Sequence, residues 1–134
     1  MNFIFENDGD TRAGNKAEVP SGIKSKTALL EALFVALRFP DYFGGNWDAL
    51  EECIRDLSWL PRGDVVLRHK DLPLPEDRAA LSTYLAILKD AMEKWSASGE
   101  RNFVVVFPPE TRHVVQCILA DEQKTGSSSG DSYA

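Results

Sequence analysis

Cysteine is scarce in this sequence, and long apolar runs are absent. The 134 residues include only two cysteines, Cys53 and Cys117, and they form no CxxC pair that would predict a redox or zinc motif. No stretch approaches the ~20 apolar residues of a transmembrane helix, and the N-terminus has no signal-peptide pattern. We therefore expect a cytoplasmic protein with reduced thiols and no membrane contact.

Positive charge and histidine are also in short supply. Fifteen Lys and Arg residues stand against twenty-one Asp and Glu residues, which gives a net charge of -6. This balance disfavours direct binding to nucleic acid and favours a basic partner. The only histidines, His69 and His113, lie at no metal-ligand spacing from each other or from a cysteine, so we expect no metal site and no cofactor.

The hydrophobic pattern predicts one α/β domain over residues 1–123 and a disordered tail over residues 124–134. Because parallel strands need crossover connections, strands that alternate with helices favour a parallel sheet packed against helices. Residues 6–22 are polar and rich in Gly and Asn, which predicts a long loop. The expected elements are a strand at Asn2–Phe5, a helix from Ser25 or Thr27, a helix after Asn46, a strand at Val65–Leu67, a helix from Pro75, a strand at Phe103–Phe107, and a short helix or edge strand beyond Pro109.

The helix expected after Asn46 carries an unusual number of acids. Asp48, Glu52 and Asp56, which we call the acidic ridge, are spaced four residues apart and therefore share one side of the helix. The apolar residues fill the opposite side. Two like-charge contacts cost an isolated helix about 0.4 to 1 kcal/mol together, so a surface that only faced water would gain from a lysine at Glu52. We interpret the ridge as a surface kept for a partner.

Other interpretations of this region are open. The charged side could be the solvated face of an ordinary amphipathic helix. The glycines of "FGGN" could cradle a phosphate, although no lysine follows as in a phosphate-binding loop. Asp48, Glu52 and Asp90 could act as acid–base or metal-binding carboxylates of an enzyme, but no histidine or cysteine is placed to assist them, and we do not expect an enzyme.

The segment "FPDYFGGNWDALEECI" resembles the one that identifies the barstar family, intracellular inhibitors of the small secreted ribonuclease barnase. The resemblance extends more weakly from Ile23 to Phe107, through "VVLRHKDL" and "LAILKDA". It implies a three-stranded parallel sheet flanked by helices. It also implies inhibition of a small basic ribonuclease. Separately, we expect the free protein to be a monomer.

The resemblance further implies which residues meet the partner. They lie in the loop before the acidic helix, on that helix and on the later long helix: Tyr42, Gly44, Asn46, Asp48, Glu51, Glu52 and Asp90. Glu52 stands where the family has a shorter Asp, Glu51 replaces a Trp of the best-known member, and Gly45 replaces an acid. An immunity protein against a different nuclease toxin, with specificity shifted by Glu51 and Glu52, is the alternative.

Overall fold

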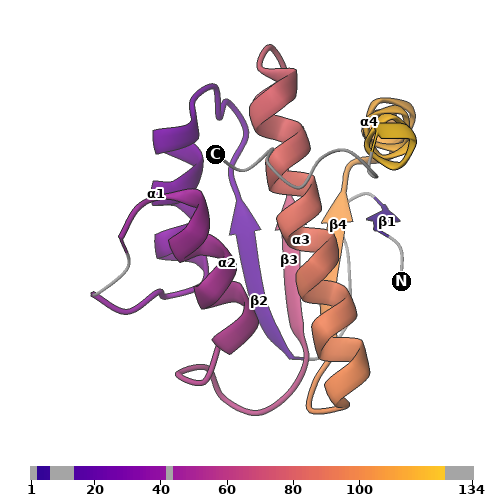
Figure 1. Cartoon of the computed structure of the whole chain (residues 1–134). Helices are drawn as coiled ribbons and strands as arrows, with labels where there is room; N and C mark the ends of the chain where they lie inside the picture. The colour runs from indigo at the N-terminus through magenta and orange to yellow at the C-terminus, as the bar shows by residue number, and fades with distance from the viewer. Residues whose placement is uncertain (1–2, 7–13, 42–43, 126–134) are drawn as a thin grey trace.

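The computed structural model describes residues 3–6, 14–41 and 44–125 of the chain. Within these ranges the chain forms both strands and helices (Figure 1). In chain order they are β1 (Ile4–Phe5), β2 (Asn15–Val19), α1 (Lys26–Ala36), α2 (Trp47–Asp56), β3 (Val65–His69), α3 (Arg78–Ser98), β4 (Phe103–Phe107), the 3-10 helix η1 (Pro109–Thr111) and α4 (Arg112–Thr125). None of the described helices is long and apolar enough to cross a membrane.

The strands form a single parallel sheet in the order β1-β4-β3-β2. β3 lies at its centre, where Val65 pairs with Phe103 of β4 on one side and with Asn15 of β2 on the other. The α/β class and the parallel sheet are therefore confirmed. The sheet has four strands rather than the three that the family resemblance implies.

Strand β2 lies where we predicted a loop, and that prediction is wrong. Its sequence NKAEV alternates, so that Ala17 and Val19 are buried while Lys16 and Glu18 are exposed. Half-burial is what the edge of a sheet with one covered face requires. The Asn15 side chain also donates to the Pro61 carbonyl at 3.0 Å, which ties the start of β2 to the loop before β3.

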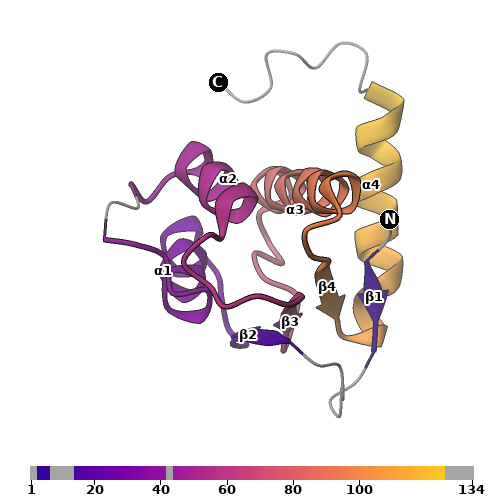
Figure 2. The ribbon, with the colours of Figure 1, turned by 90° about the horizontal axis from the view of Figure 1, so that it is seen from below.

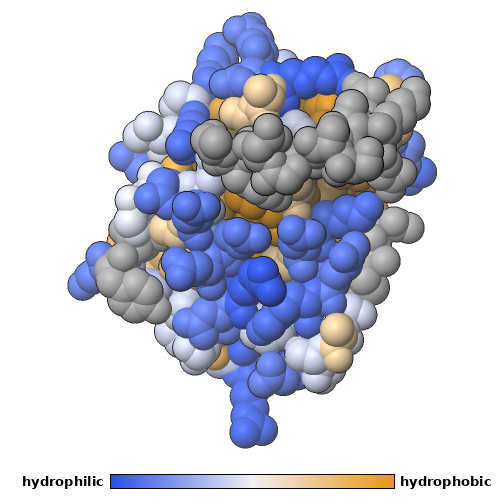
Figure 3. All heavy atoms as spheres, viewed as in Figure 1, coloured by the Kyte–Doolittle hydropathy of each residue, from blue (hydrophilic) through white to orange (hydrophobic). Residues whose placement is uncertain are grey.

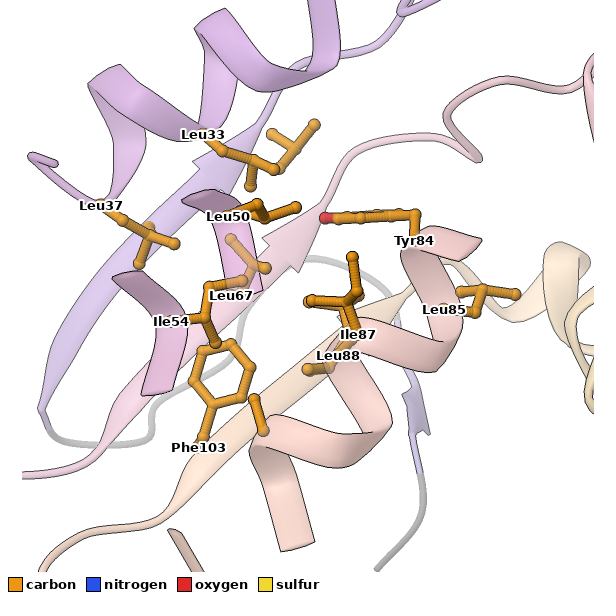
Figure 4. Close-up of a cluster of buried hydrophobic side chains, with 14 of the residues drawn as sticks. Leu33, Leu37, Leu50, Ile54, Leu67, Tyr84, Leu85, Ile87, Leu88 and Phe103 are labelled. Carbon is orange, nitrogen blue, oxygen red and sulfur yellow. The ribbon is translucent and has the colours of Figure 1, made fainter. Parts of the chain in front are cut away.

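Helices α1, α2 and α3 cover one face of the sheet, and α4 lies beside α3 at the β1 end (Figure 2). The core fills the space between this helical layer and the sheet (Figure 4). Leu50 and Ile54 of α2 point into it, toward Tyr84 of α3 and Phe103 of β4. All four side chains are buried. The inner side of α2 is therefore packed against the hydrophobic core.

The long helix α3 begins three residues later than predicted. Asp77, not the Pro75 region, starts it: the Asp77 carboxylate accepts from the Ala80 N–H at 3.1 Å and caps the helix. Gly99, at φ 71°, ends it. Beyond Pro109 the chain forms the helix α4, which ends at Thr125, while residues 126–134 lie outside the described ranges. The domain boundary at residue 123 and the disordered tail remain predictions.

A buried polar pair links β3 to α3. His69 is 2% exposed and Tyr84 is fully buried, and the His69 Nε2 lies 2.7 Å from the Tyr84 hydroxyl oxygen. The His69 Nδ1 lies 3.0 Å from the Val106 carbonyl oxygen, which can only accept. Nδ1 therefore carries the proton, and Nε2 accepts from the tyrosine. Burial lowers the pKa of His69 to about 4. His69 and Tyr84 therefore form a neutral pair whose hydrogen-bonding groups are satisfied inside the protein.

Candidate protein-binding surface

The start of α2 is fixed by its own sequence. The Asn46 side-chain oxygen accepts from the Ala49 N–H at 2.7 Å, which confirms Asn46 as the N-cap. Gly45 precedes it at φ 71°, a left-handed conformation that favours glycine. The first turn contains Asp48, whose charge meets the positive end of the helix dipole. The N-terminal end of α2 is therefore defined by its own cap.

One side of α2 is core, as predicted. Leu50, Cys53, Ile54 and Leu57 are each at most 4% exposed. Burial raises the pKa of the Cys53 thiol, and the carboxylates of Asp56 and then Glu52 raise it further. Cys53 is therefore an inert core thiol rather than a nucleophile.

The other side of α2 is acidic and exposed. All three residues of the acidic ridge, Asp48, Glu52 and Asp56, are exposed to solvent. Glu51 is partly exposed and lies 3.8 Å from Arg55, a surface ion pair that contributes little to stability. Hydrophilic residues gather over α2 and the neighbouring part of α3 on the face shown in Figure 3. With one cation among four acids, α2 offers a negative surface on a rigid support.

Side chains of α3 hold the C-terminal end of α2. The Trp95 indole N–H donates to the Ile54 carbonyl at 2.9 Å, and the Lys94 ammonium donates to the Arg55 carbonyl at 2.8 Å. These bonds satisfy two of the last carbonyls of α2, which have no partner within the helix. Leu57 then turns the chain at φ 50° and is fully buried. Both ends of the helix that carries the acidic ridge are thus tied down.

Asp90 lies on α3, exposed and one turn before Lys94, a rise of about 6 Å along the helix. Because Lys94 contacts the end of α2, Asp90 lies on the same side of α3 as that contact. Asp90 is therefore on the exposed side of α3, near the end of α2. In the described ranges no three His, Cys, Asp or Glu residues come together as metal ligands, so Asp48, Glu52 and Asp90 do not form a metal-binding set.

The loop before α2 is anchored at its entrance. Phe39 is buried and makes an edge-to-face contact with Trp59, with ring centroids 6.0 Å apart. The Trp59 indole N–H donates to the Leu37 carbonyl at 3.0 Å. Gly44 is exposed in the loop, and Tyr42 lies outside the described residues. The contacts predicted for Tyr42, Gly44, Asn46, Asp48, Glu51, Glu52 and Asp90 with a partner remain predictions.

Sequence reasoning missed three supports of this surface and one further contact. The supports are side-chain hydrogen bonds to backbone carbonyls that are distant in the sequence, donated by Trp59, Lys94 and Trp95. No local sequence pattern reveals such bonds. The missed contact is on α4, where the His113 Nε2 lies 3.6 Å from the Cys117 sulfur. The sequence argument from metal-ligand spacing did not consider this pair, whose residues are four apart in a helix. The i, i+4 spacing was the available signal.

Comparison with known proteins agrees with this arrangement. A protein-family model described as Barstar (barnase inhibitor) matches residues 19–108, which are 90 of the 134 residues. The match begins at the end of β2 and includes α1, α2, β3, α3 and β4, hence every element that supports the acidic ridge. It excludes β1 and α4. A search of curated proteins found no match to the chain.

Proposed function

The chain belongs to the barstar (barnase inhibitor) family, and from this premise we propose that it inhibits a small basic ribonuclease by covering the active site of the enzyme with the acidic ridge and the loop before α2. One observation carries the proposal. The acids Asp48, Glu52 and Asp56 share the exposed side of a helix whose opposite side is core and whose two ends are fixed.

The chemistry of the target explains the choice of carboxylates. A ribonuclease must bind a phosphate and stabilise the charge that develops on it, so its active site presents cations in a cleft. Carboxylates placed there replace phosphate oxygens and accept charge-assisted hydrogen bonds. In this proposal Asp48 and Glu52 enter the cleft, and Asp90 adds a contact from α3. Because the supporting helix is rigid before binding, little conformational entropy is lost on association.

The length of the Glu52 side chain affects which nuclease the protein can bind. Its side chain has one methylene more than the Asp of the family, which moves the carboxylate by about 1 Å in a site where desolvated ion pairs need close geometry. This favours a second candidate, immunity against a different nuclease toxin that uses the same ridge. Glu51, which is partly exposed next to the ridge, would then contribute to the altered specificity.

Neutralising single acids tests the inhibition. Asp48→Asn and Glu52→Gln should each weaken binding to the cognate ribonuclease by about 2 to 5 kcal/mol, because each leaves a buried cation of the enzyme unpaired. Both residues are exposed in the free protein, so its unfolding free energy should change by less than about 1 kcal/mol. Glu110→Gln, an exposed acid on η1, is the matched control and should bind normally. Normal inhibition by both ridge variants would refute the proposal.

Affinity capture from the source lysate distinguishes the two candidates. The wild-type chain should retain a nuclease that the Glu52→Gln variant, used as a matched bait, retains poorly. Recovery of a small basic ribonuclease supports the first candidate, and recovery of a different nuclease toxin supports the second. Cytoplasmic location and a monomeric free state remain predictions, to be checked by fractionation and sedimentation.

A further inference from the structure

Helix α4 carries two metal-ligating side chains on one side. His113 is exposed and Cys117 is partly exposed, and they are one helical turn apart. The His113 Nε2 and the Cys117 sulfur are 3.6 Å apart. This separation allows a weak hydrogen bond between thiol and imidazole, in which the two ligating atoms face each other on one side of the helix.

The separation also matches the geometry of a zinc site. Zinc binds imidazole nitrogen at roughly 2.0–2.1 Å and thiolate sulfur at roughly 2.3 Å in tetrahedral coordination. At a tetrahedral angle, these bond lengths place the two ligand atoms about 3.5 Å apart. The two atoms of the α4 pair are therefore already as far apart as two ligands of one zinc ion.

We propose that His113 and Cys117 form half of a zinc site, which the same two residues of a second copy of the chain complete. A structural zinc ion takes four protein ligands. Among the described residues, the α4 pair contributes two ligands, and no group of three or more occurs there. A two-fold axis through the metal brings two identical pairs together as a Cys₂His₂ site. Zinc binds thiolate and neutral imidazole, so each thiol releases its proton to solvent, two for each ion.

The surface around the pair suits contact between copies. Val114, next to His113, is 41% exposed and is one of two large hydrophobic residues that the described ranges leave exposed. The other, Val35, is on α1, away from α4. α3 separates α4 from α2 (Figures 1 and 2), so a pairing through α4 leaves the acidic ridge accessible. The inference thus stands independently of the proposed inhibition.

The experiment uses the full chain without a histidine tag, in the presence of a non-chelating reductant. Zinc titration should reach one ion for two chains, and sedimentation velocity should show a dimer with zinc and a monomer after EDTA. Cobalt(II) in place of zinc should give the thiolate charge-transfer and tetrahedral d–d absorption bands. Cys117→Ser and His113→Gln should each lose the dimer and the bands, whereas Gln116→Ala, an exposed change on the same helix, should keep both.

Three results would overturn the inference. They are no zinc binding by the wild-type chain, one ion bound by each monomer, and a zinc-dependent dimer that persists in both ligand variants. Circular dichroism of the variants checks folding, and little change is expected because His113 is exposed and Cys117 partly exposed. Ribonuclease inhibition is measured separately on the zinc-bound dimer. A loss of inhibition there would count against the proposed function and not against the zinc site.

Discussion

The buried pair of His69 and Tyr84 should make the stability of the fold depend on pH. In the unfolded chain His69 has an ordinary pKa of 6.5, whereas in the folded chain burial lowers it to about 4. Between these values the unfolded state binds a proton that the folded state does not, so the free energy of unfolding falls as the pH falls from about 6.5 to about 4. The difference corresponds to about 3 kcal/mol from this one residue.

The double variant His69→Phe/Tyr84→Phe removes both polar partners and keeps two aromatic rings in the core. The single variant Tyr84→Phe leaves the His69 Nε2 buried without its donor and should cost about 1 to 3 kcal/mol at pH 7. Urea unfolding, followed by circular dichroism from pH 7.5 to 4, gives the unfolding free energy of wild type and variants. Histidine NMR titration of the wild type gives the pKa of His69 directly.

The decisive quantity is the difference in unfolding free energy between wild type and the double variant. It should change by about 3 kcal/mol in favour of the variant as the pH falls from 7 to 4, because only the wild type loses the His69 contribution. The carboxylates titrate in both proteins and cancel. A difference that stays constant with pH, or a His69 pKa near 6.5, would refute the reasoning.

Three further predictions concern the acidic surface. Asn46→Ala should lower the unfolding free energy by about 1 kcal/mol through loss of the cap of α2, while Asn46→Ser should largely retain it, as urea unfolding would show. Trp95→Phe should cost about 1 to 3 kcal/mol, because the Ile54 carbonyl loses its donor; an unchanged urea midpoint would exclude that role. The rate constant for association with the ribonuclease should fall steeply with added salt, and a flat stopped-flow profile would argue against electrostatic steering.

Periodicity revealed the elements with a strong local pattern. α2, α3 and β4 follow from apolar spacing and from caps such as Asn46. Strand β2 was not predicted, because Lys16 and Glu18 make its sequence resemble a polar loop. The strand is recognisable only from its pairing with β3. The start of α3 was misplaced because Pro75 and Asp77 both suit a first turn, and the Asp77 side chain decides between them.

The acidic ridge was visible in sequence because three acids at a spacing of four must share one side of a helix. What holds the ridge was not visible. The side chains of Lys94 and Trp95 donate to backbone carbonyls that lie 39 and 41 residues earlier in the sequence. Such contacts form only when α2 packs on α3. Local chemistry thus predicts the charged surface, whereas its rigidity is a property of the tertiary structure.

The central claim is that the acidic ridge occupies the phosphate site of a ribonuclease. The most direct measurement is the affinity of the chain for its cognate ribonuclease, by titration calorimetry, at increasing concentrations of a mononucleotide that binds the active site. The account predicts competition, in which the apparent Kd of the inhibitor rises linearly with the concentration of free nucleotide and keeps rising after the site is nearly saturated. An affinity that does not change at saturating nucleotide, with all three molecules in one complex, would contradict it.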